Sequence, residues 1–180
     1  MGSRKAARDE EFRRFVDAVW PRLVRTAYLL AGDRHTAEDL AQQSLERAYV
    51  AWGRVAQADD PYAYVRRILV NEQARRHRRK APERLVDAVP DRAEPAGPER
   101  LDRLDDRASL LAALAQLPPR QRQSVVLRYW EDLSETQAAA LMGCSVGTVK
   151  SQASKGLAKL RNAAALHGLA ATTAGEGRVR

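Results

Sequence analysis

Residues 133–162, LSETQAAALMGCSVGTVKSQASKGLAKLRN, have the pattern of a helix-turn-helix. Ser134 is a favoured N-cap residue, and Gln137 three residues later completes a capping box for a first helix. Gly143 supplies the tight turn, and Ser145 is the N-cap of a second helix. The row of alanines before the glycine allows two helices to approach closely at a steep angle. The stretch therefore predicts two helices joined by a short turn.

The second predicted helix has one apolar face and one polar face. The apolar residues recur at helical spacing and are expected to point inward: Val146, Val149, Ala153, Leu157 and Leu160. The outward residues carry hydroxyl, amide and ammonium groups, which bind base edges and phosphates in a major groove: Thr148, Lys150, Ser151, Gln152, Ser154 and Lys155. An ordinary helical hairpin with a solvated polar face is the alternative. The pattern favours DNA binding.

The composition agrees with a nucleic-acid partner. The chain has 180 residues and a formal net charge of +8, and its isoelectric point is about 10.1. Such a charge favours polyanions or anionic membrane surfaces. No apolar run approaches the roughly 18 residues that span a bilayer, so no membrane insertion is expected.

Other function classes find little support in the sequence. The single cysteine, Cys144, excludes an internal disulfide, and three scattered histidines form no convincing metal site with it. No nucleophile–base pair or phosphate-binding loop is evident. We therefore expect no catalytic residues, no metal and no cofactor. The first residues lack the apolar core of a signal peptide, so a cytoplasmic location is expected.

Residues 81–107 separate two helical blocks. This segment holds four of the eight prolines, with eight acidic residues against five basic ones. Little in it could form a core, so it predicts a flexible acidic linker with a short helical start near residue 99. The blocks are residues 9–80 and 108–165, and residues 166–180 are expected to form a disordered tail. No β-branched run alternates as a strand would. The sequence predicts an all-α chain with two small helical domains, the second ending in the helix-turn-helix.

The first block contains three predicted helices. In the first, apolar residues recur at helical spacing from Phe12 to Leu30, and Pro21 predicts a kink or a fresh helix start. Thr36 is expected to cap the second helix, which ends near Trp52. Asp60 followed by Pro61 is the strongest local start signal, and the third helix runs to about Arg79.

The second block starts with a helix that carries a leucine stripe from Leu110 to Leu117. Pro118 and Pro119 end that helix. The next helix runs from Arg120 to Trp130 and is expected to bury Tyr129 in part. Cys144, at the later turn, is expected to be half-buried.

The end of the third helix is strongly basic. Between residues 66 and 80 the sequence has seven cationic residues, six arginines and Lys80, and one acidic residue, Glu72. The local excess is therefore six positive charges. A polyanion would neutralise this density, and the alternative is a solvated helix end. Unpaired bases stack on aromatic faces. Trp52 continues a buried stripe and is expected in the core, whereas Tyr62 and Asn71 are the better candidates for base contact.

These features together resemble the extracytoplasmic-function sigma factors of bacterial RNA polymerase, of the actinobacterial type. The resemblance covers residues 10–80 and 108–162 and depends on three segments in order: GDRHTAEDLAQQSLERAYVAW (32–52), DPYAYVRRILVNEQARRHRR (60–79) and LPPRQRQSVVLRYWEDLSETQAAALMGCSVGTVKSQASKGLAKLR (117–161). In the family these segments bind the clamp helices of the polymerase β′ subunit, capture and melt the −10 element, and bind the −35 element.

The resemblance implies a role for each matching residue. The implied polymerase-binding residues are Asp39, Gln42, Gln43 and Glu46. The implied −10 residues are Tyr62, Arg66, Arg67, Asn71, Arg75, Arg76, Arg78 and Arg79, and the loop Val55–Asp60 would hold a flipped-out base. The −35 duplex would be read by Lys150, Ser151, Ser154 and Lys155, with Arg120 and Arg122 near its phosphates.

The linker gains a purpose from the resemblance. Fully extended, its 27 residues reach about 90 Å, which exceeds two turns of duplex at roughly 34 Å each. In the family the linker threads toward the RNA path, and its acidic character here suits mimicry of RNA phosphates.

Three residues depart from the family pattern. Gln43 stands where relatives often carry a carboxylate, Gln152 where an arginine is common, and Lys155 in place of an arginine. The last two changes remove bidentate guanine readers, so the promoter sequence does not transfer from relatives.

The sequence therefore predicts a non-enzymatic initiation factor whose partners are core RNA polymerase, through the β′ clamp helices and the β flap, and promoter DNA, as duplex and as melted strand. A free-standing helix-turn-helix regulator and a polymerase-binding adaptor without specific DNA contacts are the alternatives. An anti-sigma factor is a further candidate partner, and the sequence leaves its existence open.

Overall fold

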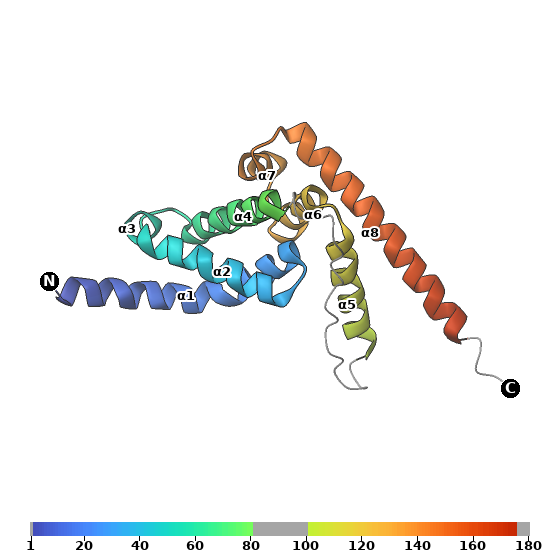
Figure 1. The fold of residues 1–180 in the computed structure, drawn as a ribbon, viewed down its shortest axis with the longest axis horizontal. Helices are drawn as coiled ribbons and strands as arrows, with labels where there is room; N and C mark the ends of the chain where they lie inside the picture. The colour runs from blue at the N-terminus through green and yellow to red at the C-terminus, as the bar shows by residue number, and fades with distance from the viewer. Residues whose placement is uncertain (1, 81–100, 176–180) are drawn as a thin grey trace. The chain divides into compact units, whose positions relative to one another are not determined.

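The computed structural model describes the backbone of residues 2–80 and 101–175 and the side chains of residues 5–79 and 108–163. Every regular element in those ranges is a helix, which confirms the predicted all-α fold class. The chain divides into two units, Met1–Ala88 and Val89–Arg180, whose helices are labelled in Figure 1.

The first unit contains α1 (Gly2–Ala31), α2 (Arg34–Val50), the single turn α3 (Trp52–Val55) and α4 (Pro61–Lys80). Helix α2 packs against both α1 and α4. The fully buried side chains between them include Leu23, Leu40, Val65 and Leu69. Each such side chain contributes about 1.5–3 kcal/mol when it leaves water, so this interior holds the three long helices together.

Helix α1 runs through Pro21 without interruption, so the predicted fresh helix start is wrong. The alternative of a kink stays a prediction. Proline removes one backbone hydrogen bond and crowds the preceding turn, at a cost of about 3 kcal/mol. Pro21 is exposed, whereas Leu23 and Ala27 just after it are fully buried. Their burial on one continuous face offsets the cost of the proline.

The N-caps of α2 and α4 are aspartates. Asp33 Oδ1 accepts a hydrogen bond of 2.7 Å from the Thr36 backbone N–H, so the prediction that Thr36 caps α2 is wrong. A carboxylate one turn earlier satisfies the same exposed donors and agrees with the positive end of the helix dipole. At α4, Asp60 Oδ1 accepts from the Ala63 N–H at 3.0 Å, and the predicted start at Pro61 is confirmed.

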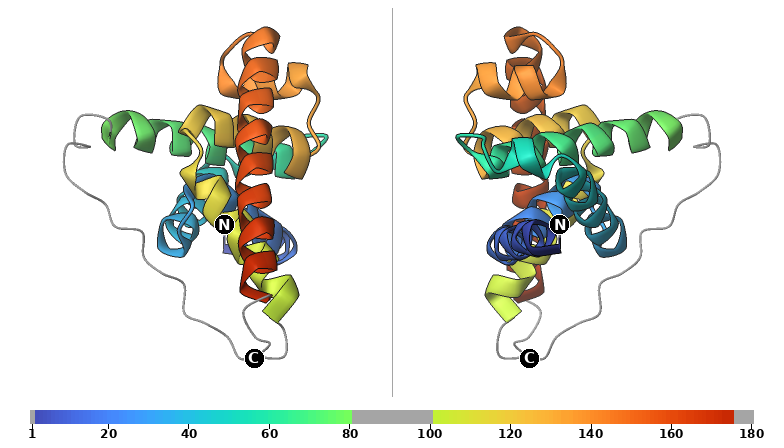
Figure 2. Two further views of the ribbon diagram at one scale, coloured as in Figure 1. Left: turned by 90° about the vertical axis from the view of Figure 1, so that its right-hand side faces the viewer. Right: turned by 90° about the vertical axis from the view of Figure 1, so that its left-hand side faces the viewer.

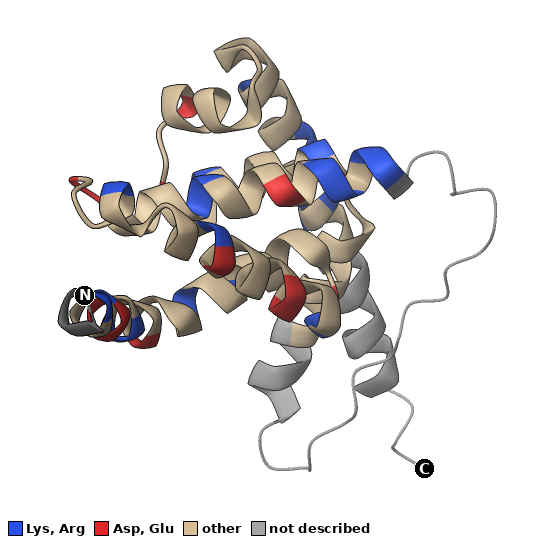
Figure 3. Ribbon diagram, turned by 60° about the vertical axis from the view of Figure 1, so that its left-hand side comes forward, with Lys and Arg blue, Asp and Glu red and all other residues tan. Residues whose placement is uncertain are grey.

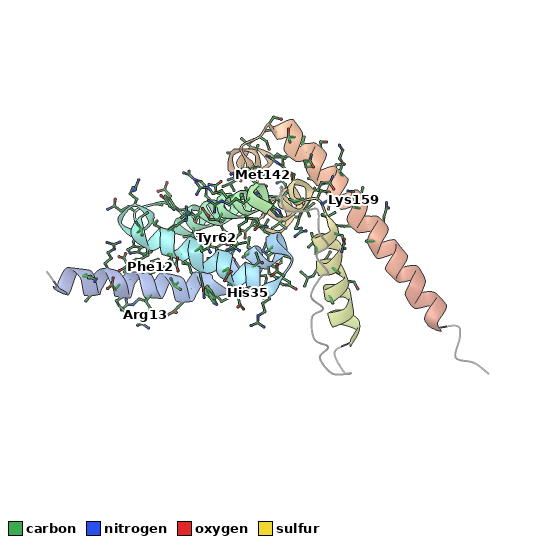
Figure 4. All side chains as sticks on the ribbon, viewed as in Figure 1. Phe12, Arg13, His35, Tyr62, Met142 and Lys159 are labelled. Atoms are coloured by element: carbon green, nitrogen blue, oxygen red, sulfur yellow. The ribbon has the colours of Figure 1, made fainter. Side chains whose placement is uncertain are left out.

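An aromatic cluster joins α1 to the end of α2 and the start of α3. The ring centroid of Phe12, labelled in Figure 4, lies 5.0 Å from that of Tyr49 and 5.1 Å from that of Trp52. Trp52 is 3% exposed, as predicted, and its indole N–H donates to Glu11. The Tyr49 hydroxyl donates to Asp9 at 2.6 Å. This hydrogen bond raises the pKa of Tyr49 above its ordinary value because phenolate formation would break it.

The second unit contains α5 (Leu101–Gln116), α6 (Pro119–Val125), a π-helical turn η2 (Val126–Trp130), α7 (Glu135–Met142) and α8 (Val146–Gly175). Helix α8 packs against α5, α6 and α7. Both views of Figure 2 show α7 beside the first turns of α8. Leu127 and Val149 are fully buried in this unit. Among the helices that the structure describes, none has the length and hydropathy needed to cross a bilayer.

Two boundaries of the second unit differ from the sequence predictions. Helix α5 starts at Leu101, close to the short helical start predicted near residue 99, so residues 101–107 of the predicted linker are helical. Residues 81–100 lie outside the described residues. Helix α8 continues to Gly175, whereas the tail from residue 166 was expected to be disordered. Alanine and leucine have high helix propensity, and six alanines and two leucines fall between residues 163 and 175, so local propensity favours continuation of the helix.

The π-helical turn changes which side chains are exposed at the end of α6. The Glu131 N–H donates to the Val126 carbonyl at 3.0 Å, a spacing of five residues. Val126 and Leu127 remain buried, while Tyr129 is 59% exposed and Trp130 is 43% exposed. Tyr129, which was predicted to be partly buried, is therefore mostly exposed.

Candidate nucleic-acid interface

The predicted helix-turn-helix is formed by α7 and α8. Ser134 Oγ accepts from the Gln137 N–H at 3.1 Å, and Gln137 Oε1 accepts from the Ser134 N–H at 2.8 Å, so the capping box is complete. Gly143 has φ 61°, the left-handed conformation that favours glycine. Ser145 Oγ accepts from the Thr148 N–H at 3.1 Å and caps α8. The three local signals at this turn are confirmed.

Small residues allow α8 to approach its neighbours closely. Ala138 and Ala139 of α7 and Ala153 of α8 are buried, and Val149 is fully buried between the helices. At Gly156 an added Cβ would lie 2.7 Å from Val125 Cγ2, so only glycine fits this crossing with α6. The packing fixes the direction in which the outer face of α8 points.

The outer face of α8 presents polar side chains to solvent. Four of the six predicted residues are exposed: Lys150, Ser151, Ser154 and Lys155. Thr148 and Gln152 are half-buried, and the Thr148 hydroxyl shares a 2.9 Å hydrogen bond with Ser145 Oγ. The Lys150 ammonium lies 3.3 Å from a Glu135 carboxylate oxygen of α7. This face offers hydroxyl donors and two ammonium groups at the start of one helix.

An open hollow of about 220 Å³ adjoins this face, lined by side chains of the π-helical turn, α7 and α8. Its charged lining consists of three cations and one anion: Arg128, Lys150, Arg161 and Glu135. Sequence reasoning missed Arg128 and Arg161. Arg161 lies eleven residues after Lys150, which is three helical turns, so a helical wheel would have found it. Arg128 lies in the π-helical turn and gave no such signal.

Arg122 does not lie on the outer surface of its unit. It is 7% exposed, and its guanidinium Nη2 donates to the carbonyls of Ala115 and, at 3.3 Å, Leu117. These carbonyls belong to the C-terminal end of α5, where four acceptors lack helical partners. The predicted phosphate contact by Arg122 is therefore replaced by a structural role. Arg120, two residues earlier, is exposed.

The basic helix α4 of the first unit carries its arginines toward its C-terminal end, as the blue ribbon in Figure 3 shows. Five of the predicted −10 residues are exposed: Arg67, Asn71, Arg75, Arg78 and Arg79. Arg76 is half-buried and Arg66 is 8% exposed. The exposed side of α4 is therefore a cationic surface that keeps one polar amide.

Ion pairs join this basic helix to α2. Glu72, whose side chain is 11% exposed, lies 2.9 Å from the Arg47 guanidinium and 3.4 Å from that of Arg75. The Arg76 guanidinium lies 3.8 Å from Asp39. Part of the positive charge of α4 is thus balanced within the unit. Sequence reasoning missed the pairing of Arg47 with Glu72, because the two residues lie 25 positions apart along the chain.

Tyr62 is buried in the first unit, with 8% of its surface exposed. The Arg22 guanidinium carbon lies 4.2 Å from its ring centroid, and that of Arg66 lies 5.6 Å away. Cations on an aromatic face are attracted by its quadrupole. The ring face that was predicted to stack a base already has cationic partners, so a base would have to displace an arginine.

The predicted polymerase-binding residues share one face of α2. Gln42, Gln43 and Glu46 are exposed, and the Asp39 side chain is 42% exposed. The opposite side of the helix is buried at Leu40 and Ala48. The exposed face carries carboxylates and amides, which suit a cationic or amide-rich partner.

Two family models match the chain. The model "Sigma-70 region 2" matches residues 15–83, and the model "Sigma-70, region 4" matches residues 107–160. Among curated relatives, the RNA polymerase sigma-E factor of Streptomyces coelicolor is 37% identical over 153 residues, which are 84% of this chain and 84% of that protein. The ECF RNA polymerase sigma factor SigE of Mycolicibacterium smegmatis is 37% identical over 88% of this chain and 62% of its own length.

Solved structures agree with these matches. The sigma factor RpoE in complex with the anti-sigma factor NepR from Bartonella quintana superposes with a TM-score of 0.65 and 25% identity, over 86% of this chain and 96% of that chain. CnrH in complex with the cytosolic domain of CnrY gives a TM-score of 0.54 at 21% identity, over 86% of this chain and 87% of that chain, and supports the fold alone.

Proposed function

Because the chain belongs to the sigma-70 family of RNA polymerase sigma factors, we propose that its two units carry the separate tasks of promoter binding assigned below. The protein is a promoter-recognising sigma factor of the extracytoplasmic-function type. One observation supports the assignment most strongly: region 2 and region 4 models match, in order, the two units that hold the basic helix and the helix-turn-helix.

The outer face of α8 reads the −35 duplex. Exposed Lys150, Ser151, Ser154 and Lys155 meet base edges and phosphates in the major groove, with Arg120 on the backbone. Arg128 and Arg161 add cationic charge beside the same face. Each phosphate that these cations neutralise steepens the salt dependence of binding by roughly 0.9 on a logarithmic scale.

The exposed side of α4 holds the melted −10 strand. Arg67, Arg78 and Arg79 follow its backbone, and Asn71 offers an amide to a base edge. Arg66 and Tyr62 lie beneath that surface and support it. The loop Val55–Asp60 is the proposed site of a flipped-out base, with Val55 buried and Asp60 engaged in capping α4.

The polar face of α2 binds core polymerase through Asp39, Gln42, Gln43 and Glu46. Catalysis then belongs to the polymerase, and the sigma factor supplies none. The place of action is the cytoplasm, where polymerase meets the genome. An anti-sigma factor is a proposed partner, since the RpoE neighbour was solved in complex with one. The segment between α4 and α5 is the proposed linker between the two tasks, and the β flap is the proposed partner of the second unit.

Run-off transcription with purified core polymerase and a genomic promoter library tests these assignments. We expect defined starts only when the protein is present. The triple variant Lys150→Ala/Ser151→Ala/Lys155→Ala should lose those starts while its affinity for core stays unchanged. Lys159→Ala is the matched control, because it removes an exposed lysine from the same helix. Wild-type transcription from the triple variant would show that α8 does not read the promoter.

A charge reversal tests the polymerase face separately. Glu46→Lys should weaken core binding in a pull-down with purified core, because it places a cation on the acidic face of α2. Asp17→Lys, on the exposed side of α1, is the matched reversal and should leave core binding unchanged. Equal core binding by both variants would remove α2 from the interface.

A further inference from the structure

An ion pair joins the two helices of the helix-turn-helix at its reading face. Glu135 is the first residue of α7, and its carboxylate lies 3.3 Å from the ammonium of Lys150 on α8. The Lys150 side chain is 61% exposed and that of Glu135 is 36% exposed. Both groups therefore remain within reach of a ligand that approaches this face.

We propose that Glu135 is a specificity-determining residue that competes with DNA for the Lys150 ammonium. The inference rests on the proposed function of α8 as the helix that reads the duplex. Lys150 can neutralise a phosphate only after its ammonium leaves the Glu135 carboxylate, or while the ammonium is shared between the carboxylate and the phosphate. Non-specific binding depends almost entirely on phosphate contacts, so the Glu135–Lys150 ion pair lowers its affinity more than it lowers the affinity for a specific site.

The charge distribution of the adjoining hollow supports this role. Among the described residues, Glu135 is the one acidic side chain that lines it, against the cations Arg128, Lys150 and Arg161. A phosphate that enters among these cations also approaches the carboxylate, and like charges repel. A duplex of the right sequence offsets that repulsion with base contacts from Ser151 and Ser154, whereas a random sequence does not. Discrimination by repulsion of wrong partners is a common source of specificity.

A purely structural role for Glu135 makes a different prediction. An acidic residue in the first turn of a helix interacts favourably with the helix dipole, and removing it weakens the helix by a small amount. Such a loss would affect α7 and lower DNA affinity in general. Competition for Lys150 predicts the opposite sign, a gain in affinity for non-specific duplex.

The test compares Glu135→Gln, Lys150→Ala and the double variant in the full chain, with Asp132→Asn as the matched control. Asp132 is exposed in the loop before α7 and has φ 52°, a conformation that asparagine also accepts, so the control removes the same charge nearby. Fluorescence anisotropy measures binding to a short mixed-sequence duplex over a KCl series, and to a duplex that the wild-type chain enriches from a randomised pool. The net charge of +8 favours measurable non-specific binding at low salt.

We expect Glu135→Gln to raise mixed-sequence affinity about two- to fivefold, the worth of an exposed ion pair. Its salt dependence should steepen by roughly 0.9, one additional phosphate contact. Affinity for the enriched duplex should rise less, so the ratio of the two affinities falls. In the Lys150→Ala background, Glu135→Gln should have no effect.

Two results would overturn the inference but leave the proposed function intact, provided that Lys150→Ala still weakens binding. In the first, Glu135→Gln changes DNA affinity no more than Asp132→Asn does. In the second, Glu135→Gln raises the affinity as much in the Lys150→Ala background as in the wild-type chain. Wild-type binding by Lys150→Ala would instead contradict the proposed reading role of α8, and the inference would fail with it.

Discussion

Replacing Arg122 with alanine separates a structural arginine from a DNA-binding one. The wild-type guanidinium donates to the carbonyls of Ala115 and Leu117, and the residue is 7% exposed. A hydrogen bond from a charged donor contributes about 1.5–3 kcal/mol, and buried carbonyls that lose their donors keep their desolvation cost. The second of the two bonds is long at 3.3 Å. We therefore expect Arg122→Ala to destabilise the second unit by about 3 kcal/mol.

Hydrogen exchange followed by mass spectrometry on peptides of α6 and α8 measures this loss within the second unit. A loss of about 3 kcal/mol lowers protection by roughly two orders of magnitude, since 1.4 kcal/mol is a factor of ten. Arg120→Ala is the control, because Arg120 is exposed on the same helix, and it should change stability by less than about 0.5 kcal/mol. If both variants kept equal protection against hydrogen exchange, and Arg122→Ala showed a shallower salt dependence of duplex binding, the structural role would be refuted. The predicted contact of Arg122 with a phosphate would then be supported.

Two further predictions concern packing and pH. Gly156→Ala should destabilise the second unit by about 1–3 kcal/mol, because its Cβ would lie 2.7 Å from Val125 Cγ2 and 3.3 Å from the Gln121 carbonyl oxygen; Gly147→Ala, whose nearest neighbour is Ser145 Oγ at 3.8 Å, should instead stabilise by up to about 1 kcal/mol. Thermal unfolding of both variants measures the difference, and a neutral Gly156→Ala would contradict the close crossing. The pKa of Tyr49 is raised from 10.0 because its hydroxyl donates to Asp9, so the stabilisation from this bond is present below pH 10 and is lost as the pH rises through the higher folded-state pKa. NMR titration of ring-labelled tyrosine should show Tyr49 moving toward its ordinary pKa in Asp9→Ala, and superimposable titrations would contradict the hydrogen bond.

Local signals in the sequence predicted the helix starts and turns that depend on few residues. Asp60 before Pro61, the Ser134 capping box and the glycine at 143 each act over three or four positions, and the structure confirms all three. The exposed polar side of α8 follows from the same local logic, because the apolar positions of one helix determine which side faces out.

Features that depend on distant partners could not be read from the sequence. The sequence shows that an arginine is charged but not whether its side chain is exposed. The burial of Arg122 depends on carbonyls at the end of another helix. Tyr62 is likewise covered by Arg22, forty residues away. The π-helical turn escaped prediction because hydrogen bonds four and five residues apart fit almost the same apolar pattern. The helical end of α8 could not be predicted because the sequence of residues 166–175 shows no amphipathic pattern.

The π-helical turn at Val126–Trp130 also bears on how such chains tolerate insertions and deletions. It accommodates one residue more than an α-helical turn would over the same stretch, and each residue of an α-helix corresponds to about 100° of rotation about the axis. A homologous chain that lacks one uncharged residue of this turn would keep every side chain of α7 and α8 and the same net charge. In such a chain the segment after the turn would leave the helix rotated by about a quarter-turn about its axis. Deleting a single residue would therefore change the orientation of an otherwise identical helix-turn-helix.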